Sequence, residues 1–176
     1  MSARAARCHV GMLLAPGTNC HEETAWALRH LGAAVIEIPW HGFLARPGSV
    51  HDARLLVLPG GFSFGDALGA GTLWGEGLRR HRHELQRFHA EGKIILGICN
   101  GFQVLLRAGL LPDPAADPGV PRPLTLARNE SGRFECRWVT VQGQPGPCPL
   151  FTPGRLYRLP VAHGEGNLQA ADLSVL

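Results

Sequence analysis

The chain has 176 residues, of which 45% are hydrophobic and 18% are charged, and its 17 basic and 14 acidic side chains give a net charge of +3. This composition fits one compact domain with a sizeable core and excludes an intrinsically disordered chain. The arginines on expected helices indicate solvated helix faces rather than the dense basic surface of a nucleic-acid-binding protein: Arg29, Arg79, Arg80, Arg82 and Arg87.

Apolar periodicity predicts strands that alternate with helices as far as Ala108. Strands are expected at His9–Leu14, Ala34–Ile38, Arg54–Leu58 and Ile94–Ile98, and helices at His21–Leu31, Leu73–Ala90 and Phe102–Ala108. Asn19 and Glu22 have the spacing of a capping box at the start of the first helix. Residues 39–52 are expected to form a loop, with a short helical turn as the alternative.

This alternation predicts βαβ units and a three-layer α/β fold, a mostly parallel sheet with helices on both faces. The long helix should bury a stripe of apolar side chains, namely Trp74, Leu78, Leu85 and Phe88. After a proline-rich surface loop at Pro112–Pro123, β-type runs predict an antiparallel extension at Leu124–Arg128, Phe134–Val141 and Leu156–Val161. We expect a single domain over residues 1–176.

The cysteines are widely spaced, and none belongs to a C-x-x-C pair: Cys8, Cys20, Cys99, Cys136 and Cys148. An odd number of isolated cysteines favours free thiols in a reducing compartment. Neither a signal peptide nor an apolar stretch of membrane-spanning length is evident, so we expect a cytoplasmic protein. The cysteine and histidine spacing is not that of metal ligands, so no metal site is expected.

The segment around Cys99 carries the clearest chemical signal. An apolar strand leads into Gly97-x-Cys99-x-Gly101, and a helical pattern follows at once. This is the layout of a nucleophile elbow, with cysteine in the place of serine. A helix that begins just after Cys99 should direct its positive end at the sulfur and favour the thiolate. The alternative is a buried cysteine of the core, but the flanking glycines favour a nucleophile for acyl transfer.

Pro59-Gly60-Gly61 ends the third expected strand in a tight turn. A Gly-Gly corner leaves backbone N–H groups accessible to neighbouring groups. If this strand lies beside the Cys99 strand, the N–H groups of Gly61 and Asn100 can form an oxyanion hole. A plain glycine-rich turn is the alternative. Both motifs, together with Pro16-Gly17, should lie at the carboxyl edge of the sheet, where sites in parallel sheets are found.

Several longer motifs together resemble one family. They are Ala15-Pro16-Gly17-Thr18-Asn19-Cys20, Pro59-Gly60-Gly61-Phe62-Ser63-Phe64-Gly65-Asp66, Gly97-Ile98-Cys99-Asn100-Gly101-Phe102-Gln103, Arg128-Asn129 with Phe134-Glu135-Cys136-Arg137, and Pro160-Val161-Ala162-His163-Gly164-Glu165-Gly166. The chain resembles the class I (triad) glutamine amidotransferases, and among them the glutaminase subunits of phosphoribosylformylglycinamidine synthase in de novo purine biosynthesis. The resemblance covers nearly the whole chain.

The resemblance implies a flavodoxin-like core and a glutaminase reaction. Cys99 would attack the side-chain amide of L-glutamine to form a thioester and release ammonia, with Gly61 and Asn100 holding the oxyanion. Gly60 and Gln103 would contact the substrate; the alternative for Gln103 is a polar helix residue bound to a neighbouring loop. The ammonia would pass to a synthetase partner, with or without a small accessory subunit, that uses ATP and formylglycinamide ribonucleotide. ATP and magnesium would bind that partner, because this sequence has no G-x-x-x-x-G-K-[ST] loop.

One feature of the family is absent from these 176 residues. The family supplies its catalytic histidine and glutamate from a Pro-His-Pro-Glu segment near the C-terminus, so we expect a C-terminally incomplete amidotransferase domain with low or no turnover. His163 and Glu165 have a similar spacing, but they lie in a motif that the family has in addition to its triad.

Two other hypotheses remain open. One is a non-catalytic scaffold that binds the synthetase partner. The other is a related cysteine-elbow enzyme such as a peptidase or deglycase, for which a histidine would be expected directly after the nucleophile, where Asn100 stands.

Overall fold

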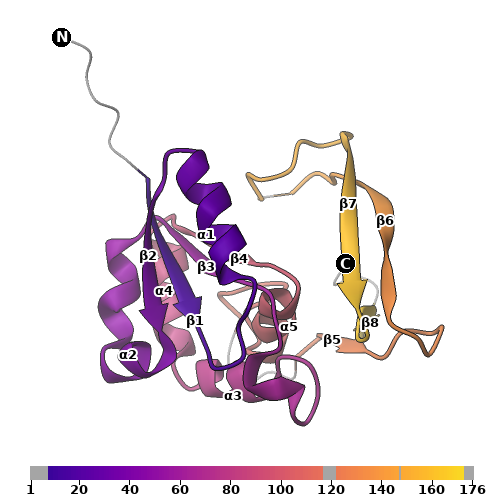
Figure 1. Ribbon diagram of the computed structural model, residues 1–176, viewed down its shortest axis with the longest axis horizontal. Coiled ribbons are helices and arrows are strands. Elements are labelled where there is room, and N and C mark those ends of the chain that lie inside the picture. Colours follow the sequence, from indigo (N-terminus) through magenta and orange to yellow (C-terminus); the bar gives the residue numbers. More distant parts are fainter. Residues whose placement is uncertain (1–7, 117–121, 147, 173–176) are drawn as a thin grey trace. The chain divides into compact units, whose positions relative to one another are not determined.

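The computed structural model describes residues 8–116, 122–146 and 148–172. The chain divides into two compact units. Residues 8–116, 122–126 and 168–172 belong to the first, which we call the sheet unit, and residues 127–146 and 148–167 form the second, the hairpin unit. Figure 1 shows the elements of both units. The expected single domain over residues 1–176 remains a prediction.

A parallel four-stranded sheet forms the centre of the sheet unit. Its strands are β1 (His9–Leu14), β2 (Ala34–Pro39), β3 (Leu55–Leu58) and β4 (Ile94–Gly97), in the order β2-β1-β3-β4. All three strand pairs are parallel. The four expected strands are confirmed, and the strand order changes direction between β1 and β3, as in flavodoxin-like sheets.

Side chains alternate between the two faces of the sheet, because successive strand residues point to opposite sides. On one face Val10, Met12 and Val57 pack with Ala25 of α1 (His21–His30). Leu13, Leu56 and Leu58 point to the other face and join the larger core. The predicted helix at this position is confirmed. The capping box is wrong, since Cys20 occupies the N-cap without a side-chain cap, and Asn19 instead accepts a hydrogen bond from the Cys20 thiol at 3.3 Å.

The second face is covered by α2 (Trp40–Ala45), the 3-10 turn η1 (Pro47–Asp52), α3 (Thr72–Arg79), α4 (Arg82–Ala90) and α5 (Asn100–Arg107). Residues 39–52 are therefore largely helical, and they are not the loop that was expected. Phe43 and Val50 explain the difference, because both side chains are fully buried in this core.

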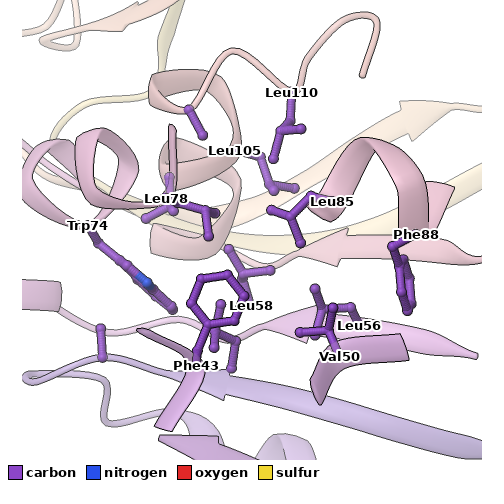
Figure 2. Packing of buried hydrophobic residues seen from close by; sticks show 14 of the residues in the cluster. Phe43, Val50, Leu56, Leu58, Trp74, Leu78, Leu85, Phe88, Leu105 and Leu110 are labelled. Carbon is purple, nitrogen blue, oxygen red and sulfur yellow. The ribbon is translucent and has the colours of Figure 1, made fainter. Parts of the chain in front are cut away.

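The predicted helix at Leu73–Ala90 is interrupted at Arg80 and His81 and forms α3 and α4. Its predicted apolar stripe is confirmed. Figure 2 shows Trp74, Leu78, Leu85 and Phe88 entering one cluster with Leu56 and Leu58 of β3. The break allows α3 to pack on α5 while α4 packs on β4 and η1.

Arg82 corrects the expectation that the helix arginines are solvated. Arg82 is only 5% exposed, and its guanidinium donates a hydrogen bond to the Ala116 carbonyl at 2.7 Å. The other four arginines named with it are exposed, as expected.

The predicted β-type runs after Leu111 are also strands. In the hairpin unit, β6 (Glu135–Gln142) pairs antiparallel with β7 (Leu156–His163), as expected. β5 (Leu124–Ala127) pairs with β8 (Asn167–Ala170), a short strand that the sequence pattern did not predict. Part of the predicted 112–123 loop, residues 117–121, lies outside the described residues. None of the described helices is both long and apolar enough to span a bilayer.

Candidate active site

Cys99 stands in a sharp turn between β4 and α5. Its φ of 51° and ψ of −108° place it in the left-handed half of backbone space, which is costly for a residue with a side chain. Gly97 and Gly101 permit the turn. A Cβ on Gly101 would overlap the Leu58 carbonyl oxygen, and one on Gly97 would lie 2.7 Å from the Gly101 backbone. The strand-turn-helix geometry of a nucleophile elbow is therefore present, and the Cys99 residue is exposed.

The charge balance at Cys99 differs from the sequence expectation. Partial burial of the thiol raises its pKa, the backbone N–H of Asn100 lowers it by a hydrogen bond, and the negative charge of Asp66 raises it again. The net direction is upward from the ordinary value. The prediction that α5 makes the thiolate the favoured form is wrong, because loss of solvent and the nearby carboxylate outweigh the helix N-terminus.

The glycine turn after β3 lies against this elbow. Leu58 pairs with Gly97 in the parallel ladder, so the two strands are neighbours, as the oxyanion hypothesis requires. A Cβ on Gly60 would lie 3.4 Å from the Cβ of Cys99 and 3.6 Å from the sulfur of Cys20. Gly61 has a φ of 134°, and a Cβ there would come within 2.7 Å of the Asn19 nitrogen. The glycines thus allow three backbone segments to approach closely.

The loop after β1 completes the site edge. The N–H of Phe62 donates to Gly17 at 3.1 Å, that of Phe64 to Pro16 at 2.7 Å, and that of Cys20 to Gly60 at 3.3 Å. Because β1, β3 and β4 are parallel, their carboxyl ends meet at one edge. The predicted gathering of Pro16-Gly17, Gly60-Gly61 and Cys99 at this edge is confirmed.

A buried polar network joins the glycine loop, residues 59–66, to α5. The Asn100 side chain is central to it. Its Oδ1 accepts from the Ser63 N–H at 3.1 Å, and its Nδ2 donates to Asp66 Oδ1 and to Gln103 Oε1, both at 3.0 Å. Asn100 and Gln103 are 2% and 8% exposed. The sequence pattern predicts a role only for the backbone N–H of Asn100 and none for Asp66, although both residues belong to the motifs that carry the family resemblance.

Gln103 therefore has a protein partner in this structure. Its bond to Asn100 fits the alternative in which it is a polar helix residue tied to its neighbours. A contact with substrate remains a prediction for Gln103, as it does for Gly60.

The hairpin unit contains a second network, centred on Asn129. Its N–H donates to Gly164 at 3.0 Å, its Nδ2 to the carbonyls of Arg133 and His163 at 2.8 and 2.9 Å, and its Oδ1 accepts from the Gly166 N–H at 2.9 Å. Because Nδ2 donates to two carbonyls, the orientation of the amide is defined. His163 Nδ1 lies 2.9 Å from that Oδ1, within hydrogen-bond distance.

Among the described residues, no group of three or more His, Cys, Asp or Glu side chains could hold a metal ion.

Comparison with known proteins identifies relatives of this architecture. A sequence model of the CobB/CobQ-like glutamine amidotransferase domain matches residues 7–176. The phosphoribosylformylglycinamidine synthase subunit PurQ of Dehalococcoides mccartyi is 44% identical over 160 residues, which is 89% of this chain and 61% of the relative. The subunit of the same name from Methanococcus maripaludis strain C5 is 39% identical over 153 residues, 86% of this chain and 56% of the relative.

A solved structure extends the likeness to the fold. A chain in the structure of PurLQS from Thermotoga maritima superposes with a TM-score of 0.76 at 29% sequence identity, covering 96% of this chain and 72% of that chain. The present chain spans about three fifths of the length of the two PurQ relatives.

Proposed function

Because the chain belongs to the CobB/CobQ-like glutamine amidotransferase family, we propose that it is a glutaminase subunit with Cys99 as the nucleophile. The observation that carries this proposal is the left-handed turn at Cys99 beside the glycine loop. It presents a thiol at the edge of the sheet, beside the backbone N–H of Asn100 and the glycine turn. This is the arrangement that acyl transfer from an amide requires.

In the proposed reaction the Cys99 sulfur attacks the side-chain amide carbonyl of L-glutamine. The carbonyl oxygen becomes an oxyanion, which the N–H groups of Gly61 and Asn100 stabilise. Collapse of the tetrahedral intermediate breaks the C–N bond and releases ammonia, leaving a thioester on Cys99. Water then attacks the thioester, so that glutamate leaves and the thiol is restored. We assign Gly60 and Gln103 to the substrate side of this site.

The raised pKa of Cys99 makes a general base necessary, because most of the thiol is protonated at neutral pH. In the family that the sequence resembles, a Pro-His-Pro-Glu segment supplies the base, and these 176 residues contain no such segment. We therefore propose slow thioester formation by these residues alone. Loss of a base costs such enzymes orders of magnitude in rate.

We further propose that the ammonia passes to a synthetase partner, which converts formylglycinamide ribonucleotide to formylglycinamidine ribonucleotide with ATP and magnesium. The names of the relatives, a synthase subunit and a PurLQS assembly, support this assignment. An additional small subunit would complete the complex. The odd number and wide spacing of the cysteines, and the relatives that are named as subunits of a synthase, support a cytoplasmic location.

A second candidate is a non-catalytic scaffold that binds the synthetase partner. The raised pKa of Cys99 favours it, because a thiol that stays mostly protonated is a weak nucleophile. The intact elbow favours catalysis.

Glutamate release from glutamine, measured with the synthetase partner present, separates the two functions. Release that disappears in Cys99→Ala and persists in Cys148→Ala, an exposed cysteine outside the quoted motifs, supports the glutaminase. Equal background from all three proteins would contradict glutamine hydrolysis by these residues and would favour the scaffold. A glutamine turnover of about 1 per second or more by the 176 residues alone would contradict slow thioester formation.

A further inference from the structure

We propose that the side chain of Asn100 is a positioning residue, which clamps the glycine loop onto the nucleophile helix and so sets the geometry of the oxyanion hole. This inference rests on the proposed glutaminase function. In the proposed reaction only the backbone N–H of Asn100 takes part. The clamp adds a role for its side chain, and it makes Asp66 the partner of that side chain.

Both polar atoms of the Asn100 side-chain amide have hydrogen-bond partners. Both hydrogens of Nδ2 have acceptors, Asp66 Oδ1 and Gln103 Oε1, and Oδ1 accepts from the backbone of Ser63. An amide whose donors and acceptor are all engaged has one orientation and one position. With the residue 2% exposed, water cannot replace these partners. Asn100 thereby ties α5 to the middle and to the end of the glycine loop.

The glycine loop has a backbone conformation that must be held by contacts with its surroundings. Phe64 and Asp66 have φ values of 52° and 51°, and Leu68 just beyond them has 64°. Residues other than glycine rarely adopt positive φ values. A segment with several such residues persists only where neighbouring segments hold it in place. The β1 loop holds one side through the bonds to Phe62 and Phe64. Asn100 holds the segment from α5, at Ser63, which is itself 1% exposed.

The Asn100 clamp also affects both proposed oxyanion donors. Gly61, one proposed oxyanion donor, lies two residues before Ser63, which the Asn100 side chain holds. The backbone N–H of Asn100 is the second donor, and it already hydrogen-bonds the Cys99 sulfur. One residue therefore provides one donor and fixes the loop that provides the other. Misplacement of such donors by about 1 Å costs roughly 100-fold in rate.

The clamp can be broken and then restored by exchanging its donor and its acceptor. In Asn100→Asp the shape is kept, but the donor to Asp66 is lost and two carboxylates face each other. Adding Asp66→Asn returns one donor and one acceptor to the pair, now in the reverse direction. Gln86→Glu makes the same amide-to-carboxylate change on α4, where Gln86 bonds the Pro114 carbonyl, and serves as the matched control.

Two readouts are measured on each variant. Amide hydrogen exchange of peptides covering residues 61–71 reports how firmly the loop is held. Steady-state glutamate release with the synthetase partner gives kcat and KM for glutamine. We expect Asn100→Asp to raise loop exchange about tenfold or more and to lower kcat about 100-fold, with KM changed less than about threefold. The double variant should recover at least about tenfold in kcat and most of the exchange protection. Gln86→Glu should match the parent.

Three outcomes would overturn the clamp: unchanged loop exchange in Asn100→Asp, increased exchange with kcat at the parental value, or a double variant no better protected than Asn100→Asp. Should Asn100→Asp fail to fold, the same test can be made at Asp66. Asp66→Ala removes the acceptor of the Asn100 bond, whereas Asp66→Asn keeps an acceptor oxygen. A parent that releases no glutamate would overturn the glutaminase and the catalytic half of this proposal, while loop exchange still decides whether Asn100 holds the loop.

Discussion

Gly60 lies beside Cys99: a Cβ built on Gly60 would be 3.4 Å from the Cβ of Cys99. The two residues are 39 positions apart in the sequence (99 − 60), and the pairing of β3 with β4 brings them together. The glycine turn after β3 and the turn that carries the thiol therefore lie side by side. The consequences of this packing can be tested at individual glycines.

Gly60→Ala and Gly101→Ala should differ sharply. A methyl group on Gly60 meets its neighbours at ordinary contact distance, so the protein should fold with a melting temperature near that of the parent but with slower alkylation of Cys99. A methyl group on Gly101 overlaps the backbone oxygen of Leu58, and the required shift should cost at least about 2 kcal/mol of unfolding free energy. Chemical denaturation of both variants checks this. Equal stabilities would contradict the packing described.

The reactivity of Cys99 should depend on pH in a defined direction. Burial and the Asp66 charge raise its pKa, so the thiolate fraction at neutral pH is smaller than for an ordinary cysteine, and alkylation by iodoacetamide should accelerate into the alkaline range. Asp66→Asn removes one of the causes that raise the pKa and should move the rate profile to lower pH. Asp52→Asn, at an exposed position on η1, should leave it in place. Peptide mass spectrometry from about pH 6 to pH 10 gives the profile. A midpoint below that of free cysteine would refute the charge balance.

Asn129 should stabilise the hairpin unit. Asn129→Leu removes an amide that makes bonds to Arg133, His163 and Gly166, and at about 1 kcal/mol for each bond the unfolding free energy of this unit should fall by about 2–4 kcal/mol. Gln144→Leu, at an exposed site of the same unit, should change it by less than about 0.5 kcal/mol. Hydrogen exchange of residues 160–167 resolves the two. Similar protection in both variants would show that the network contributes little.

Two tryptophans provide a matched test of the core. Trp74 is fully buried among the residues in Figure 2, whereas Trp26 on α1 is 67% exposed. Trp74→Ala should cost about 3–5 kcal/mol, and Trp26→Ala less than about 1 kcal/mol, because only the first leaves a cavity. Urea denaturation followed by circular dichroism measures both. Comparable losses would mean that α3 is not seated on the core as described.

Much of the architecture can be predicted from local patterns in the sequence. The apolar runs at His9–Leu14 and Ile94–Ile98 predict buried strands, since only a parallel sheet covered on both faces buries continuous apolar strands. Gly97-x-Cys99-x-Gly101 predicts the elbow, because the turn needs residues without a Cβ on either side of the nucleophile. Each of these patterns spans only a few consecutive residues, so it can be recognised in the sequence without knowledge of the tertiary structure.

The remaining features depend on contacts between distant segments. The capping box at Asn19 fails because the helix begins one residue later and Asn19 packs beside Gly61. The role of the Asn100 side chain depends on Asp66, 34 residues away, and no local pattern indicates that pairing.

The sequence by itself determined the four parallel strands, the apolar stripe and the candidate nucleophile, since each follows from local periodicity or from steric limits at glycine. Only the tertiary structure decided the charge state that Cys99 favours. Solvent exclusion and the Asp66 carboxylate act on the thiol through space, and they raise its pKa against the direction that the helix N-terminus alone predicts.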